Sequence, residues 1–295
     1  MTGSPGQGVV VGIDGSTHSD QALDWAADEA ARRGVPLRIA YAWVLAPYQV
    51  PPSDRGDIAE GVAEGADELL RAAQERVRKQ HADLEVTGEL LTESAAQGLI
   101  RLAEDAELLV VGSRGLGRFP SMLLGSVSQS LVAHAPCPVV VLRGGEAPEG
   151  AGVEADAPVV LGAGPGEVAA PVRFAFAEAA RRGVPLLVVR AWQCPPNTGG
   201  YIQLLPEDTT RRENAEREEL GRALADARAA FPGVRTVEEV GMHEPAWALV
   251  DASARACLLV IGAERRRHRF AMPIGRVAQQ VLHHAHCPVT VVPHP

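Results

Sequence analysis

A tandem repeat constrains the fold of this 295-residue chain more than any other feature. The hexapeptide RRGVPL occurs at residues 32–37 and recurs at 181–186, which is 149 residues further along. Two further pairs of segments follow in the same order: ELLVVG at 107–112 with CLLVIG at 257–262, and HAPCPVVV at 134–141 with HAHCPVTV at 284–291. Because the matches keep one order and nearly one register, the sequence indicates that one unit has been duplicated.

Each repeat predicts strands that alternate with helices. Apolar runs such as VVVGI at 9–13 and VVLGA at 159–163 are near-continuous, as is typical of strands buried on both faces. Helices are predicted at 17–33, 57–80 and 94–105 in the first half, and at 168–182, 207–230 and 244–255 in the second. Strands separated by helices pair in parallel through right-handed crossovers. The predicted fold class is therefore α/β, with two tandem, Rossmann-like, doubly wound sheets of five parallel strands.

The two copies define two predicted domains. The first is predicted to span 1–147 and the second 155–295, with a junction at 144–157 that is rich in Gly, Glu and Ala. The composition, with 46% hydrophobic and 22% charged residues, is that of a folded soluble protein with enough apolar material for two cores.

The charge of the chain counts against several classes of function. The net charge is -9, and residues 1–150 hold 21 acidic and 12 basic side chains, which leaves 16 of each in the second half. Nucleic acids and anionic membranes attract basic surfaces, so neither is an expected partner. The N-terminus lacks the basic start and apolar core of a signal peptide, and the expected location is the cytoplasm. Lys79 is the lone lysine, which counts against Walker-type phosphate binding and Schiff-base chemistry.

Ligand chemistry is expected where the strands of such a sheet end. In open α/β sheets, ligands bind beyond the carboxyl ends of the strands, near the point where the strand order reverses. The segment after the fourth strand of the first half reads GSRGLGRFPSMLLGS, from Gly112 to Ser126. Its glycines allow positive φ and exposed amide donors, and Ser126 is expected to cap the following helix, whose start favours anions. These features predict a phosphate site, and a glycine-rich surface loop without function is the alternative.

Better-known nucleotide motifs do not match this chain. The spacing from Gly112 to Gly117 fits the first part of a Walker A loop, but Arg118 and Phe119 replace its Lys and its Ser or Thr. In the second half, GAGPG begins like a dinucleotide fingerprint, but Glu167 stands where the third glycine belongs. Neither HExxH nor GxSxG occurs in the sequence.

The glycine segment resembles that of a known family. Gly112, Gly115, Gly125 and Ser126 spell G-x2-G-x9-G-S, which is similar to the nucleotide signature of the ATP-binding universal stress proteins. The resemblance extends to Asp14 in VVVGIDGS, to the CPVVV strand and to the tandem arrangement, and it implies an adenine nucleotide alpha-hydrolase-like fold. The nucleotide-binding residues that it implies in the first half are Gly12, Asp14, Ala42, Gly112, Arg114, Gly115, Gly117, Arg118, Gly125, Ser126 and Val127.

The resemblance implies a regulatory role rather than an enzymatic one. The expected ligand is ATP, with or without Mg²⁺, held by the first domain of a stress-response regulator whose conformation or association depends on nucleotide. It also implies that tandem chains dimerise, and a protein partner of unknown identity is expected. Two alternatives remain. The protein is a slow ATPase or nucleotide-transferring enzyme, or it is a docking protein whose duplication is structural.

The second half departs from the nucleotide signature. Gly164 stands in the position of Asp14, Arg265 in that of Gly115, and Arg276 in that of Ser126. Arginine does not replace the conformational role of glycine at low cost, so one ATP per chain is expected. The loop 264–269 reads ERRRHR, and its arginines either fill the vacated phosphate site or capture a small anion, or they form a solvated basic loop.

Other candidate residues have simpler interpretations. His283, His284, His286 and Cys287 resemble metal ligands, but they straddle a helix end and a strand start, so convergence on zinc is not expected. Cysteines at the matched positions 137 and 287 are predicted to be small buried residues of core strands. No metal site and no catalytic residue is predicted.

Overall fold

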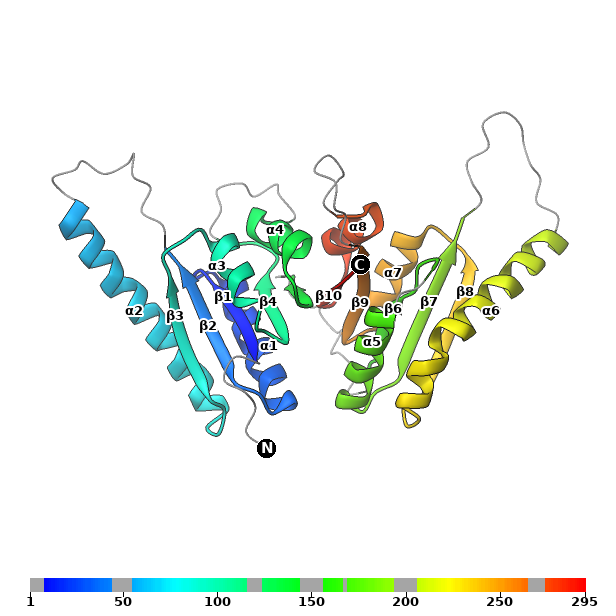
Figure 1. The fold of residues 1–295 in the computed structure, drawn as a ribbon, viewed down its shortest axis with the longest axis horizontal. Coiled ribbons are helices and arrows are strands. Elements are labelled where there is room, and N and C mark those ends of the chain that lie inside the picture. The colour runs from blue at the N-terminus through cyan, green and yellow to red at the C-terminus, as the bar shows by residue number, and fades with distance from the viewer. Residues whose placement is uncertain are drawn as a thin grey trace, which may run out of the picture. The chain divides into compact units, whose positions relative to one another are not determined.

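The protein divides into two compact units, Met1–Gly144 and Gly145–Pro295, called unit 1 and unit 2 below. The structure, a computed structural model, describes residues 8–43, 55–115, 124–143, 156–166, 169–193, 206–264 and 274–295, with the backbone alone at 55–63 and 206. Each unit is a doubly wound parallel sheet of the class that the sequence predicts (Figure 1).

Unit 1 contains five strands and four helices among its described residues. In chain order these are β1 (Val9–Ile13), α1 (Thr17–Arg33), β2 (Leu37–Ala42), α2 (Arg55–Gln80), β3 (Val86–Leu91), α3 (Ala95–Leu102), β4 (Leu108–Gly112), α4 (Ser126–His134) and β5 (Val139–Leu142). The strands lie in the order β3-β2-β1-β4-β5 and pair in parallel, with Val9 opposite both Leu37 and Leu108. The order therefore reverses between β1 and β4.

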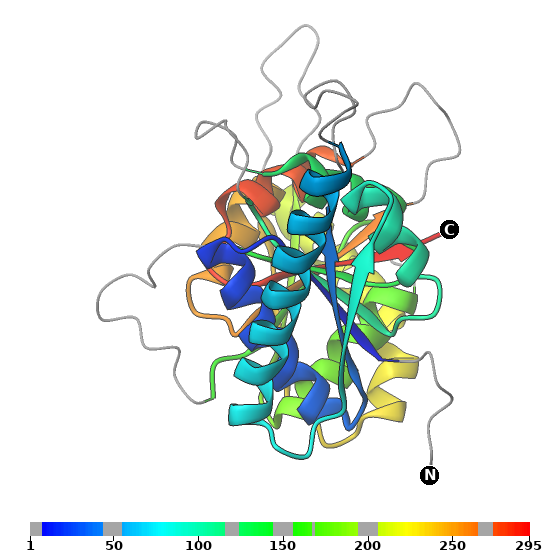
Figure 2. The ribbon, with the colours of Figure 1, turned by 90° about the vertical axis from the view of Figure 1, so that its left-hand side faces the viewer.

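Two helices cover each face of the unit 1 sheet. Helices α1 and α2 pack against one face, and α3 and α4 pack against the other. Figure 2 faces unit 1 and shows the long α2 running alongside β3. Because both faces are covered, Val9, Val10 and Val11 of β1 are fully buried, which accounts for the continuous apolar run in the sequence.

Unit 2 repeats this architecture. Its described elements are β6 (Val159–Gly162), α5 (Ala169–Arg182), β7 (Leu186–Trp192), α6 (Pro206–Ala230), β8 (Thr236–Met242), α7 (Pro245–Ser253), β9 (Leu258–Glu264), α8 (Arg276–His284) and β10 (Val289–His294). The parallel strands lie in the order β10-β9-β6-β7-β8. Helices α5 and α6 cover one face, and α7 and α8 cover the other.

Local sequence signals explain where helix α1 begins and ends. The Ser16 hydroxyl accepts a hydrogen bond from the Ser19 amide and caps the first turn. Arg32 and Arg33 lie in the last turn, and Gly34 ends the helix with φ of 67°, a left-handed conformation that favours glycine. The predicted helix 17–33 is therefore confirmed at both ends. The helix predicted at 94–105 is shorter, because the backbone tightens into a turn at Ala103.

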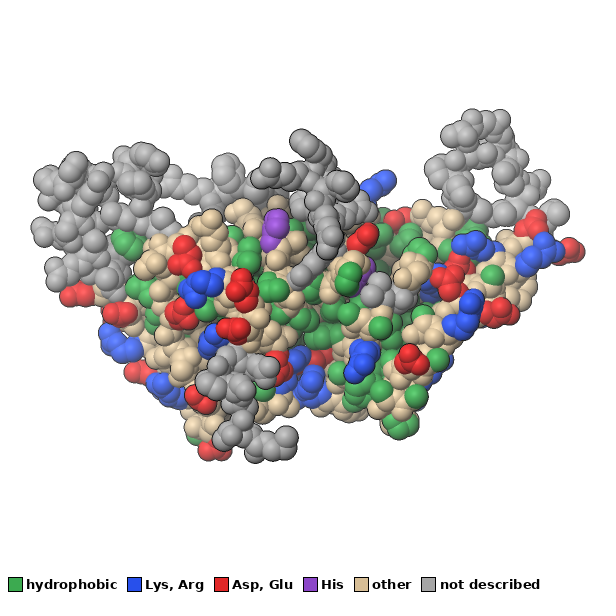
Figure 3. Space-filling view, in the orientation of Figure 1, with side chains coloured by type: hydrophobic (Ala, Val, Ile, Leu, Met, Phe, Trp, Pro, Cys, Tyr) green, Lys and Arg blue, Asp and Glu red, His purple; other side chains and the backbone are tan. Residues whose placement is uncertain are grey.

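The two long helices, α2 and α6, are rich in charged residues. Within the described ranges, no helix is long and apolar enough to cross a membrane. Figure 3 shows acidic and basic side chains interspersed on the face that it presents. Arg211 on α6, for example, has a side chain that is 79% exposed. Helix α6 therefore exposes charged side chains to solvent.

Candidate functional site

A cavity of about 550 Å³ opens in unit 1 where the strand order reverses. It lies between the carboxyl ends of β1, β2 and β4 and the starts of α1 and α4, and its volume is typical of a small-molecule site. Nine of the residues predicted from sequence line it: Gly12, Asp14, Ala42, Gly112, Arg114, Gly115, Gly125, Ser126 and Val127. The other two, Gly117 and Arg118, lie outside the described residues.

One side of this cavity is apolar. Ala40 and Ala42 come from β2, Leu91 ends β3, and Leu99 projects from α3. Gly12 permits this arrangement, because a Cβ at that position would lie 2.8 Å from Leu99 Cδ1. A flat, uncharged group such as a nucleobase fits this kind of wall.

The loop after β1 directs a carboxylate toward the cavity. Asp14 Oδ1 accepts hydrogen bonds from the Ser16 amide (3.0 Å) and the Ser16 hydroxyl (2.6 Å). Between them, Gly15 takes φ of 80°, where a side chain would be strained. Asp14 is thus oriented by the residues that begin α1.

The glycines of the predicted phosphate site provide space for the cavity rather than unusual backbone angles. Gly112, Gly115 and Gly125 all avoid positive φ, so that part of the sequence-based interpretation is wrong. A Cβ at Gly112 would lie 3.1 Å from the backbone oxygen of His18, and a Cβ at Gly115 would collide with the carboxylate of Asp14. Side chains at these positions would therefore collide with atoms that line the cavity.

Helix α4 presents its first turn to the cavity. Its N-cap is Gly125, in an extended conformation without a side-chain cap, and Ser126 is the first helical residue. The expectation that Ser126 caps the helix is therefore wrong. Because no side-chain bond occupies the cap, the amide donors of the first turn face the cavity at a helix start that favours anions. The Ser128 hydroxyl donates to the Gly112 carbonyl (2.8 Å) and ties this turn to β4.

Arginine supplies positive charge at the same end of the cavity. Arg114 Nε is buried and has no hydrogen-bond partner among the described residues. A second arginine, Arg143, follows β5, and burial together with repulsion from Arg114 lowers the pKa of its guanidinium. The buried, unsatisfied donor of Arg114 favours an anion in the cavity.

Sequence reasoning missed several residues of the cavity wall. His18 and Ser19 of α1 line it, as do Ser128 of α4 and the apolar wall of the preceding strands and helix. The first turn of α1 follows Asp14 directly, so its inward positions are a signal that was available in the sequence. Arg143 carried no such signal, because its proximity to Arg114 depends on the pairing of β4 with β5.

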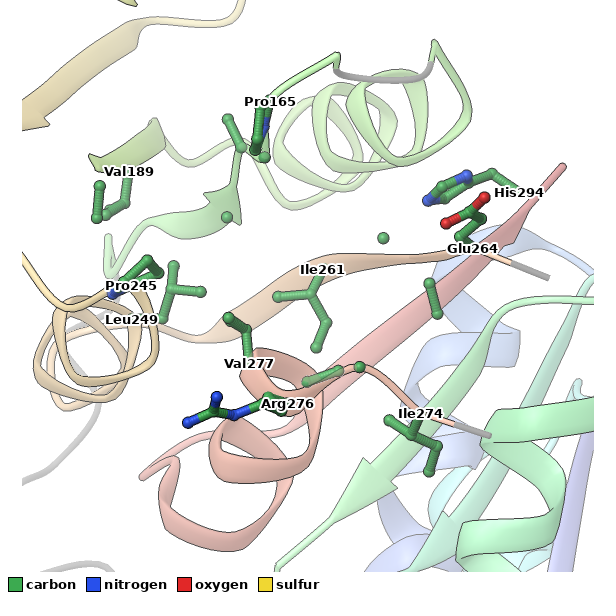
Figure 4. Close-up of a pocket in the computed structure, with 18 of the residues that line it drawn as sticks. Pro165, Val189, Pro245, Leu249, Ile261, Glu264, Ile274, Arg276, Val277 and His294 are labelled. Carbon is green, nitrogen blue, oxygen red and sulfur yellow. The ribbon is translucent and has the colours of Figure 1, made fainter. Parts of the chain in front are cut away.

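Unit 2 contains a corresponding cavity of about 660 Å³ (Figure 4). It is lined by the ends of β6, β7 and β9 and by the starts of α7 and α8. Gly164 replaces Asp14, Glu264 replaces Arg114 and Arg276 replaces Ser126. Arg265, predicted to replace Gly115, lies outside the described residues. The cavity of unit 2 lies at the same place in the fold as that of unit 1, but the charged residues that line the two cavities differ.

A buried ion network fixes the loop after β6. The guanidinium of Arg190 on β7 donates to the Gly164 carbonyl and pairs with Glu216 (2.6 Å) and Glu219 (3.1 Å) on α6. Arg190 and Glu216 are 2% and 4% exposed. Glu219 also accepts from the Gly166 amide, and this bond, followed by the charge of Arg190, holds the pKa of its carboxyl below the usual range.

Comparison with known proteins identifies the family. A sequence model of the Universal stress protein family matches residues 7–143 and 158–293. The chain belongs to the universal stress protein family. Universal stress protein Rv2005c of Mycobacterium tuberculosis is 34% identical over 298 residues, which cover 96% of each chain. A universal stress protein of Mycolicibacterium smegmatis is 35% identical over 300 residues, covering 97% of this chain and 96% of the other.

The solved structures agree with this fold. The crystal structure of a universal stress protein from Archaeoglobus fulgidus DSM 4304 has a TM-score of 0.69 and 17% sequence identity, and the match covers 97% of this chain and 98% of that one. At this identity, the likeness concerns the fold alone. Tandem universal stress domains are therefore shown by sequence, and the solved structure supports their fold.

The remaining candidate residues of this universal stress protein are the histidines and cysteines near the last strand of each unit. Among the described residues, no group of three or more His, Cys, Asp or Glu side chains is placed to hold a metal. Cys137 and Cys287 are both 6% exposed, which confirms the prediction that they are buried core residues. Burial raises the pKa of the Cys287 thiol to about 12, so it is an inert side chain at neutral pH.

Proposed function

We propose that unit 1 binds ATP and that the protein is a nucleotide-dependent stress-response regulator. The observation that carries the proposal is the cavity itself. An apolar wall, a glycine-lined passage, the open start of α4 and the unsatisfied Arg114 guanidinium meet in one space of about 550 Å³. Each part suits one part of a nucleoside triphosphate, and family membership supports the same ligand class.

The described residues suggest a division of tasks within the cavity. Ala42 and Leu99 would hold the adenine by apolar contact, and Asp14 lies where its carboxylate would accept from ribose hydroxyls. The amides of Ser126 and Val127 and the guanidinium of Arg114 would hold phosphate oxygens. Bound ATP, with or without Mg²⁺, supplies the polyanion that these donors lack.

The regulatory part of the proposal follows from the limited chemistry of the site. Hydrolysis of a phosphoanhydride needs a positioned water and groups that stabilise developing charge. A protein that binds ATP and reports its presence needs only a site whose occupancy changes the surrounding surface. We therefore include in the proposal a dimer of tandem chains, located in the cytoplasm, that recognises a protein partner according to nucleotide occupancy.

The test is to identify and count the bound nucleotide. Purified protein is heat-denatured, the released nucleotide is identified by mass spectrometry, and ATP binding to nucleotide-free protein is measured by calorimetry. One ATP per chain is the expected result. Arg71 of α2 is exposed and lies outside the cavity, so Arg71→Glu is a charge-matched control for changes at Arg114. Absence of released nucleotide, together with absence of ATP binding, would reject the proposal.

A second candidate function is slow ATP hydrolysis. It is favoured by one observation, that His18 lines the same cavity as Asp14, so a base and a carboxylate are available in one place. Accumulation of ADP that disappears in Asp14→Asn and His18→Gln would support it. Intact ATP after prolonged incubation would leave the binding role alone.

A further inference from the structure

The unit 2 cavity retains the apolar half of the unit 1 site. Val189 and Ala191 of β7 occupy the positions of Ala40 and Ala42, and Leu249 of α7 occupies that of Leu99. Gly162 repeats the close approach seen at Gly12, since a Cβ there would lie 2.9 Å from Leu249 Cδ1. The wall suited to a nucleobase is therefore present in both units.

The anion-binding half of the unit 2 cavity is divided between opposite charges. Glu264 at the end of β9 places a carboxylate where unit 1 has the Arg114 guanidinium. Glu264 is the register partner of His294 on β10, and Figure 4 shows both side chains together at one end of the cavity. Phosphate groups that extend toward this end would meet a like charge.

The start of α8 keeps one favourable position for an anion. Gly275 is the N-cap, in the extended conformation of Gly125, and a Cβ at Gly275 would meet nothing within 4 Å. Arg276 is the first helical residue; it lines the cavity and its side chain is exposed. Figure 4 shows Arg276 well separated from Glu264 and His294.

From this arrangement we infer that the unit 2 cavity is a second ligand site, selective for a nucleoside that carries a single phosphate. The retained apolar wall takes the base, and Arg276 with the amides of the first turn of α8 takes the one phosphate. The carboxylate of Glu264 excludes the longer phosphate chain. The inference rests on the proposed function for the ligand class, and it gives one chain two sites that prefer opposite ends of the ATP-to-AMP series.

The experiment titrates AMP into the full chain in the presence of saturating ATP. One AMP per chain is expected to bind while ATP remains bound. Arg276→Met is expected to weaken AMP binding about 10-fold or more, through loss of a charge-assisted contact, and to leave ATP binding unchanged. Arg211→Met, on the exposed surface of α6 outside the cavity, is the matched control and should change neither.

A second variant keeps the test independent of Arg276. Glu264→Arg replaces the carboxylate by the charge that Arg114 supplies in unit 1 and is expected to raise ATP stoichiometry from one to two per chain. The inference is overturned if AMP fails to bind the ATP-saturated chain, if Arg276→Met leaves AMP affinity unchanged, or if the wild type already binds two ATP. Two ATP per wild-type chain would overturn the inference but leave ATP binding by unit 1 intact. If the wild type instead binds AMP but no ATP, the proposed function alone is rejected.

Discussion

The two units hold the loop after their first strand in different ways. In unit 1, Asp14 is oriented by hydrogen bonds from Ser16, and a Cβ added at Gly15 would lie 3.2 Å from Leu69 Cδ1, so this apolar side chain lies beside the loop. In unit 2, the corresponding loop is bonded to the buried Arg190 and, through Glu219, to α6. One loop offers its carboxylate to the cavity, and the other is fixed to the body of its own domain.

The two units also differ in the residue types at the positions that surround this loop. Tyr41, Ala66 and Leu69 of unit 1 correspond to the network residues of unit 2, which are Arg190, Glu216 and Glu219. Three uncharged residues of unit 1 thus correspond to the three residues of an ion network in unit 2. The second unit therefore has an internal restraint where the first directs a carboxylate toward its cavity.

The largest expected effect is on the stability of unit 2. Arg190→Met leaves the buried Glu216 with one exposed partner, Arg212, and is expected to lower the free energy of unfolding by about 3 kcal/mol. Urea unfolding followed by tryptophan fluorescence measures it. The double variant Arg190→Met with Glu216→Leu should recover most of the loss, because it leaves no unpaired buried charge. A cost below about 1 kcal/mol for the single variant would contradict the assignment of the network.

The next effect concerns the charge of the unit 1 cavity. Arg114→Glu copies Glu264 of unit 2 and places a carboxylate beside the phosphate position, so ATP affinity is expected to fall about 100-fold, which corresponds to about 2.7 kcal/mol. Calorimetry with Arg71→Glu as the control measures the change. If both variants bind ATP like the wild type, Arg114 does not contact the phosphates.

A smaller effect is expected from the size of one glycine. Gly115→Ala pushes the Asp14 carboxylate from its position and is expected to weaken ATP binding about 10-fold. Gly275→Ala in unit 2 is the control, because its new methyl group meets open space. Equal ATP affinities for the two alanine variants would show that the predicted phosphate site tolerates a side chain at Gly115.

The smallest effect is the pH dependence contributed by Glu219. Its folded-state pKa is lowered by the Gly166 amide and by Arg190, so its stabilisation is complete above the unfolded pKa of about 4.3 and is lost as pH falls through the lowered value. The loss should stay below about 1 kcal/mol, because the side chain is 45% exposed. Unfolding curves at pH 7 and pH 3 should show it, and Glu219→Gln should reduce the difference. An unchanged difference would assign the acid sensitivity to other carboxyl groups.

Much of the fold followed from the sequence because its signals are local. The apolar runs, the cap at Ser16 and the Arg-Arg-Gly helix end act within a few residues, and the repeat supplied each signal twice. The cavity location followed from the general rule for parallel sheets. Nine of the predicted residues line this one cavity.

The remainder depended on contacts between distant segments. The proximity of Arg143 to Arg114 arises from strand pairing, and the Arg190 network joins positions 26 and 29 residues apart through the packing of α6 on its sheet. The errors at Ser126 and at the glycine φ angles have a common cause. A motif specifies residue types, but the backbone angles depend on how the loop closes, here through the Gly125 amide bonded to the Ser113 carbonyl (2.7 Å).

The glycine cap at the start of α4 and α8 has a consequence for how such proteins diverge. Because Gly125 and Gly275 cap their helices without any side chain, the fold does not depend on the residue that follows. That residue is Ser126 in one copy and Arg276 in the other, and both helices begin at it. After duplication, the residue at this position was therefore able to differ between the two copies while the architecture of both stayed intact.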